Sequence, residues 1–208
     1  GKLPAMVFGE QYTYPETDGS GNNRDNLRKA LSLFADAGWT LDDGKLVNSD
    51  GKQFSLEFVD RSPDAERYLL PWVENLQRLG IDAELRILDT TQWLEKIRSR
   101  DFEMTSYVYG SSYTPGTQMR YYWSSDLAST PGSIAFHGYE SEVLDDLIDR
   151  LTSADSREEL NQVAKALDRV LTTEHVVVLN WYFDKFRLLY WDKFGTIDNS
   201  GDPDFLGR

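Results

Sequence analysis

The order of patterns along the chain predicts an α/β fold, with a mostly parallel sheet and helices on both faces of that sheet. Apolar and polar residues alternate over 54–58 and 81–87, and 102–108 forms a third apolar segment, so we expect three strands. The two segments between them repeat apolar residues at helical spacing. A strand–helix–strand–helix–strand order requires crossover connections, which produce parallel strands covered by helices.

The segment before this unit predicts a helix and a hairpin. Apolar residues recur at helical spacing at Leu27, Ala30, Leu31 and Phe34. Gly38 ends that helix, and turn residues at 42–44 and 48–51 then enclose a short apolar pair, so a small hairpin should follow. Residues 2–23 are rich in Gly, Pro, Asn and Thr, which is typical of an extended lead-in.

Several helices carry start signals. Ser62 followed by Pro63 predicts a cap with proline in the first turn. Ser141 predicts the cap of a later helix, and Ser156 with Glu159 predicts a capping box for the helix after it. We expect a long connection over 109–139, strands at 176–182 and 186–191, and a turn-rich tail from residue 195.

The composition narrows the class of partner. The chain has 208 residues with 22 Lys plus Arg and 35 Asp plus Glu, a net charge of −13. This charge repels nucleic-acid phosphates and gains nothing from anionic lipid surfaces, so no nucleic acid partner is expected. The absence of cysteine excludes disulfides, thiolate nucleophiles and cysteine-based metal sites.

Motifs for catalysis and for metal binding are absent from the sequence. His137 and His175 are the two histidines, and they fit no zinc or calcium motif, so neither a metal site nor a cofactor is expected. No nucleophile elbow or phosphate-binding glycine loop occurs. Paired acids such as Asp145 and Asp146 lie where a helix starts, and acids there favour the helix dipole. The sequence therefore does not predict an enzyme.

One segment concentrates polar and aromatic side chains directly after the third predicted strand. Its members are Tyr109, Ser111, Ser112, Tyr113, Thr114, Gln118, Arg120, Tyr121, Tyr122 and Trp123. Ligands of parallel sheets bind outside the carboxyl ends of the strands, so this segment predicts a ligand-facing wall. The same residues also fit a long surface loop held by aromatic anchors, and both interpretations stay open.

The order of several short blocks resembles family 5 extracellular solute-binding proteins of ABC importers. Residues 23–31 with 35–39 resemble the family's "NR-NLR-AL-LL-AGW" block, and 43–47 its following hairpin. Residues 102–104 resemble its "FDM" strand, and 166–171 and 190–195 resemble its closing segments. The resemblance is greatest to the oligopeptide-binding, Yej-like periplasmic subgroup.

This resemblance implies a lobe of the type II periplasmic-binding-protein fold in a two-lobed binder about three times as long. Residues 1–23 would lead in from the other lobe, 24–180 would form the C-terminal ligand-binding lobe, and 181–208 would return toward the other lobe. It further implies a periplasmic, exported protein whose signal peptide is not in this chain. The partner would be an ABC permease in the inner membrane, and the protein would be a monomer.

The resemblance also implies where a peptide or similar small solute would bind. The expected contacts are Tyr109, Ser111, Ser112, Tyr113, Gln118, Arg120, Asn180, Trp181 and Tyr182. Arg120 could pair with a ligand carboxylate or brace the loop, and residues 180–182 could touch ligand or pack at the hinge. Many members carry an acid in this loop that pairs with the peptide amine, whereas 109–120 contains none. Alternative ligands are oligosaccharides, opines or nickel complexes, and the other classes are a carboxylate-dependent hydrolase or an interaction module.

Overall fold

The computed structural model describes residues 8–10, 12–110, 114–182, 189, 191 and 193. The chain divides into two compact units. Thr13–Val108 form the first, here called the sheet unit, and Gly1–Tyr12 with Tyr109–Arg208 form the second, the helical unit. The range 24–180 that we assigned to one lobe contains parts of both units, and that assignment stays a prediction. No helix among the described residues has the length and apolarity to cross a membrane.

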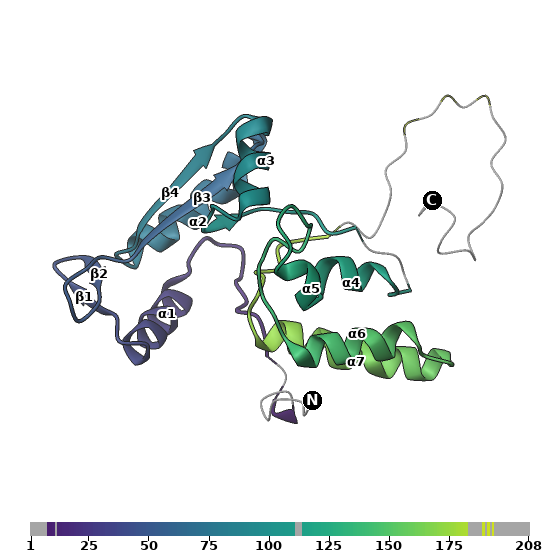
Figure 1. Cartoon of the computed structure of the whole chain (residues 1–208). Helices are drawn as coiled ribbons and strands as arrows, with labels where there is room; N and C mark the ends of the chain where they lie inside the picture. Colours follow the sequence, from purple (N-terminus) through teal and green to yellow (C-terminus); the bar gives the residue numbers. More distant parts are fainter. Residues whose placement is uncertain are drawn as a thin grey trace. The chain divides into compact units, whose positions relative to one another are not determined.

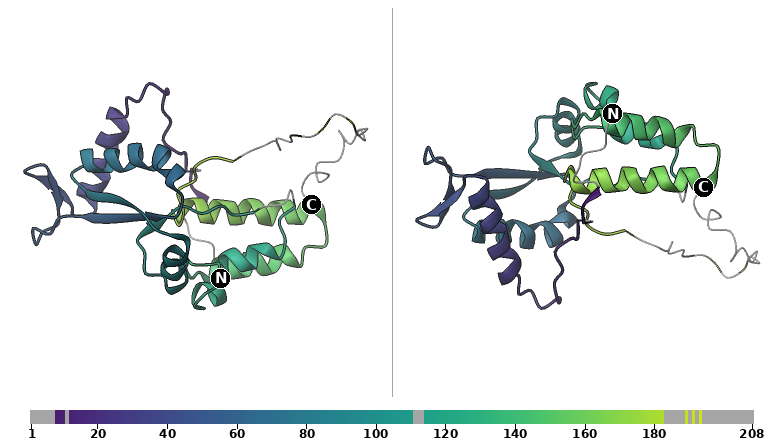
Figure 2. Two further views of the ribbon diagram at one scale, coloured as in Figure 1. Left: turned by 90° about the horizontal axis from the view of Figure 1, so that it is seen from above. Right: turned by 90° about the horizontal axis from the view of Figure 1, so that it is seen from below.

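The sheet unit has the predicted alternation of strands and helices. Its elements are α1 (Arg24–Asp36), β1 (Thr40–Asp42), β2 (Lys45–Val47), β3 (Ser55–Asp60), η2 (Pro63–Ala65), α2 (Glu66–Arg78), β4 (Asp82–Ile87), α3 (Thr90–Ser99) and β5 (Met104–Thr105). β3 lies between β4 and β5 and pairs in parallel with both, and β1 and β2 form an antiparallel hairpin (Figure 1). Helices α2 and α3 lie on opposite faces of the sheet (Figure 2). The predicted α/β class is confirmed.

The hairpin is joined to the start of β4 through Gly80. The amide of Leu46 donates to the Gly80 carbonyl at 2.8 Å. Gly80 has φ +83°, and a Cβ there would lie 2.7 Å from the Leu46 nitrogen and 2.8 Å from the Gly44 oxygen. Both the left-handed backbone and the close approach therefore require glycine at this position.

The core of the sheet unit lies between the sheet and the helices that cover it. One buried cluster comprises Leu46, Val73, Leu79, Ile81 and Ala83, and the apolar side of α1 packs against it. A second cluster comprises Phe58, Ala65 and Leu69. The helical spacing in α1 and α2 thus serves to cover the alternating apolar residues of β3 and β4.

The helical unit contains α4 (Gln118–Trp123), α5 (Ser125–Ala128), α6 (Glu142–Thr152) and α7 (Arg157–Thr173). Helices α6 and α7 lie side by side (Figures 1 and 2). Their core residues are Trp123, Leu144, Leu147, Ile148, Leu167 and Val170. This unit therefore has an apolar core of its own, separate from that of the sheet unit.

The predicted serine caps of α6 and α7 are confirmed, the capping box of α7 is confirmed only in part, and the predicted cap at Ser62 is wrong. The hydroxyl of Ser141 accepts from the Leu144 amide, and that of Ser156 from the Glu159 amide. The Glu159 carboxylate accepts from Asp155, one residue before the cap, so the capping box is shifted by one position. The hydroxyl of Ser62 makes no capping hydrogen bond to η2. The backbone amide of Ser62 instead donates to Asp60 Oδ1, which holds the turn after β3.

Three further expectations are wrong. The third strand is only Met104–Thr105, because β3 pairs with it through Phe58 and Val59 alone. Residues 118–128 form α4 and α5 where we expected a connection. Residues 176–182 contain no strand, since no neighbouring strand pairs with them among the residues that the structure describes. Most of 186–191 and all of the tail from residue 195 lie outside the described residues.

Candidate functional site

Tyr109, at the start of the predicted wall, belongs to an aromatic cluster of the helical unit. Its ring centroid lies 5.0 Å from that of Tyr122, 5.3 Å from Trp123 and 6.5 Å from Phe136. Tyr109 is half-buried and packs on the core around Trp123. Its ring therefore anchors the segment, and Ser111, Ser112 and Tyr113 lie outside the described residues.

The polar residues that follow are engaged within the helical unit. Arg120 on α4 forms an ion pair with Asp149 on α6. The Gln118 amide donates to the Thr114 carbonyl at 3.4 Å, and Arg157 donates to the Thr114 hydroxyl at 3.0 Å. Of the two roles that the sequence leaves open for Arg120, the bracing contact is present, and a ligand contact stays a prediction.

His137 joins two parts of the long connection. Its Nε2 lies 2.7 Å from the Tyr122 carbonyl, and its Nδ1 accepts from the Tyr139 amide at 2.9 Å. The ring stacks on Trp123 at 5.0 Å. Both nitrogens contact backbone, as in a structural histidine. Over the described part of the chain, no three His, Asp or Glu side chains group as a metal site would require.

The last predicted contacts lie after α7. Asn180, Trp181 and Tyr182 are exposed, with Tyr182 at 85%. They belong to no helix or strand. Whether they touch ligand or pack at a hinge stays a prediction.

A polar edge that we did not predict lies at the carboxyl end of β3. Asp60, the last residue of that strand, is only 4% exposed. Its carboxylate accepts from the Ser62 amide at 2.8 Å and from the Ser106 hydroxyl, and its backbone oxygen accepts from Leu88. One buried acid thus ties together the segments that leave the three parallel strands. The available signal was an acid directly after a buried apolar strand.

Beside Asp60, Arg61 and Trp93 form a second part of this edge. The Arg61 guanidinium lies 4.5 Å from the centroid of the Trp93 ring. Trp93 on α3 is 3% exposed, and its indole nitrogen donates to the Thr105 hydroxyl on β5 at 3.0 Å. The ends of β3 and β5 and the first turn of α3 therefore meet at a fixed aromatic ring with a cation on it.

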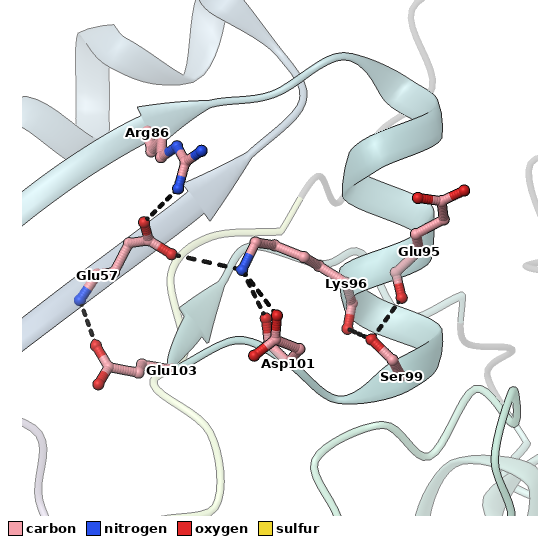
Figure 3. Close-up of polar contacts among 7 residues, drawn as sticks. All are labelled: Glu57, Arg86, Glu95, Lys96, Ser99, Asp101 and Glu103. Carbon is pink, nitrogen blue, oxygen red and sulfur yellow. Dashed lines mark hydrogen bonds and ion pairs between the residues drawn. The ribbon is translucent and has the colours of Figure 1, made fainter.

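A network of charged residues on the sheet unit links strands of the sheet with α3 (Figure 3). Glu57 pairs with Arg86 at 3.0 Å and with Lys96 at 3.9 Å, and Lys96 pairs with Asp101 at 3.2 Å. The Glu103 carboxylate accepts from the Glu57 amide at 2.5 Å. These contacts join β3, β4, α3 and the turn before β5. A shallow hollow of about 350 Å³, lined by Arg86, Gln92 and Lys96 among others, adjoins the network. Its cations are already paired.

Comparison with known proteins decides the family. Residues 3–130 match the profile described as Bacterial extracellular solute-binding proteins, family 5 Middle. This match covers more than half of the chain. The chain belongs to this family. Its parallel sheet covered by helices has the type II periplasmic-binding fold.

The family 5 chain is also similar to individual relatives. It is 34% identical to the "Probable peptide-binding protein YejA" of Agrobacterium fabrum and 36% identical to the "Uncharacterized protein YejA" of Escherichia coli. Each match covers 92% of this chain, but only 31% and 32% of the respective relative. The family 5 chain thus spans about a third of the length of these relatives.

Two solved structures show the same fold. The oligopeptide-binding protein AppA of Bacillus subtilis, in complex with a nonapeptide, matches with TM-score 0.62 and 20% identity, over 81% of this chain and 35% of that one. A periplasmic oligopeptide-binding protein of Thermotoga maritima, with bound mannohexaose, matches with TM-score 0.65 and 18% identity, over 72% and 29% of the two chains. At these identities the likeness concerns the fold alone.

Proposed function

We propose that this family 5 chain is the C-terminal ligand-binding part of a peptide-binding protein that feeds an ABC importer. The observation that carries the proposal is the similarity over 92% of the chain to a relative named as a probable peptide-binding protein. The polar edge at the carboxyl ends of the parallel strands supports it, because ligands of such sheets bind there. Ligand would be enclosed when a second lobe closes over this edge.

The proposed contacts of the helical unit are the residues that the sequence singled out. Tyr109, Gln118 and Arg120 would shape one wall, although each also contacts the helical unit. Ser111, Ser112 and Tyr113 would supply hydroxyls. Asn180, Trp181 and Tyr182 would lie where the chain turns toward the second lobe.

An oligosaccharide is the second candidate ligand. One structural neighbour that is named for oligopeptides holds mannohexaose, so the fold accommodates both classes. Aromatic side chains such as Tyr121, which is 58% exposed, suit flat sugar faces as well as peptide side chains. Opines and nickel complexes would require the same edge.

The place of action follows from the proposed role. The protein would work in the periplasm as a monomer and deliver its ligand to a permease in the inner membrane. Size-exclusion chromatography with light scattering would test the monomer.

Binding assays with two ligand sets test the proposal. The complete open reading frame that encodes this chain would be expressed and titrated calorimetrically with a random tetrapeptide pool and with an oligosaccharide panel. We expect saturable heat with peptides and none with sugars. Heat with sugars alone would contradict the peptide assignment and retain the scaffold.

A further inference from the structure

We propose that Arg61 on the Trp93 ring is a binding site for a ligand carboxylate. The inference rests on the proposed function and names the chemistry of one contact in it. Arg120, for which the sequence left a ligand contact and a bracing role open, is paired with Asp149. Arg61 is exposed and forms no ion pair with any residue that the structure describes.

The position of Arg61 is that of a ligand group in a parallel sheet. It directly follows β3 (Ser55–Asp60), the central strand, at the carboxyl end. Asp60 turns inward to Ser106 and the Ser62 amide, and Arg61 is exposed. The strand end therefore presents a cation, while the acid beside it is used for structure.

The Arg61 guanidinium lies over the Trp93 ring, 4.5 Å from its centroid. The Trp93 indole is buried and held by the hydrogen bond to Thr105, so the ring is a rigid surface. A guanidinium that stacks on a ring keeps its N–H edges free for an anion. Part of the side-chain entropy that binding would cost is already lost in the stacked state. Planar bidentate pairing then favours a carboxylate over a neutral group.

Two sources could supply this carboxylate in a peptide: its C-terminus or an acidic side chain. Three probes separate them: tetra-alanine with a free C-terminus, tetra-alanine amide, and a tetrapeptide amide of three alanines and one glutamate. Each would be titrated against the protein expressed from the complete open reading frame, and against its variants Arg61→Gln and Arg61→Lys. Arg28→Gln is the matched control, an exposed arginine on α1 of the same unit.

We expect the wild type to bind at least one carboxylate probe about tenfold or more tightly than tetra-alanine amide. Arg61→Gln should remove that preference and leave the affinity for the amide unchanged. Arg61→Lys should restore part of it, since charge returns without the planar fork. Arg28→Gln should behave as the wild type. No preference in the wild type, or a preference that survives in Arg61→Gln, would overturn the inference.

A second readout keeps the two proposals distinguishable. Acetate would be titrated at constant ionic strength while the Nε–H resonances of the arginines are followed by NMR. We expect a saturable shift at Arg61 and a much smaller one at Arg28. If no peptide binds but Arg61 responds in this way, the peptide assignment fails and the carboxylate site stands. Equal responses at both arginines would overturn the site.

Discussion

At the scale of single residues, glycine and polar side chains decide local structure more than the apolar pattern does. Gly80 permits the contact between the hairpin and the start of β4, and Asp60 ties the ends of the three parallel strands. Neither role is visible from residue type alone, because each depends on a partner distant in sequence.

Replacing Gly80 by alanine should destabilise the sheet unit more than the same change at Gly38. Both have φ near +85°, at +83° and +86°, so both variants lose about 1–2 kcal/mol to the left-handed backbone. Only at Gly80 would the new Cβ collide with backbone, at 2.7 Å from the Leu46 nitrogen, whereas nothing lies within 4 Å at Gly38. Urea unfolding of both variants measures the difference, and equal losses would refute the close contact.

Because of Tyr139, the free energy of unfolding should depend on pH in the alkaline range. Burial raises the pKa of Tyr139 above its ordinary value of 10.0. The hydrogen bond with Glu174 and the negative charge of Glu174 raise this pKa further. The folded state then holds the proton to higher pH than the unfolded state. This contribution to stability is therefore complete below pH 10 and is lost as the pH rises through the folded pKa.

The variant Tyr139→Phe should accordingly show a shallower fall in unfolding free energy above pH 10 than the wild type. Glu174→Gln should give an intermediate slope, since one of the causes is removed. Denaturant unfolding at a series of alkaline pH values provides the measurement. If the unfolding free energy fell with pH at the same slope in all three proteins, the raised pKa of Tyr139 would be contradicted.

At the scale of elements, most helices and strands of the sheet unit follow from the sequence. The alternation in 81–87 gives β4, and the helical spacing of apolar residues on either side of it gives α2 and α3. The short helix α4 was missed because Met119, Tyr122 and Trp123 have helical spacing over only six residues between turn-forming neighbours. Strand β5 is short because β3 offers it only Phe58 and Val59, a limit set by the partner.

The candidate site was predictable only in part, because its contacts join residues that are distant in sequence. The segment after β5 was found from its composition, but the ion pair of Arg120 needs Asp149 from another helix. Arg61 was missed because its signal is the Trp93 ring, which is 32 positions further along the chain. Contacts between distant residues follow from packing, which no local pattern encodes.

The ion pair between Arg120 on α4 and Asp149 on α6 can be tested by a double-mutant cycle. Arg120→Ala, Asp149→Ala and the double variant should give a coupling energy of about 0.2–1 kcal/mol, because both side chains are substantially exposed. If Arg120 acts only as a brace, the two single variants should weaken peptide binding equally. A much larger effect of Arg120→Ala on the dissociation constant would instead assign it to the ligand.

At the scale of the whole molecule, the proposed function requires that ligand bind at the carboxyl edge of the parallel strands. The chain spans about a third of the length of these relatives, and in the proposed function a second lobe would complete the cleft. A ligand held between two lobes is desolvated from both sides, whereas one lobe alone leaves it largely in water.

Thermal unfolding with and without a pool of short peptides tests this claim most directly. The protein from the complete open reading frame would be compared with the 208-residue chain. A ligand that binds only the native state stabilises it by about 2.7 kcal/mol at a concentration of 100 Kd, so its midpoint must rise. We expect a clear rise of the midpoint for the complete protein and little change for the chain alone. No rise for the complete protein with any peptide, together with a rise on adding oligosaccharides, would contradict it.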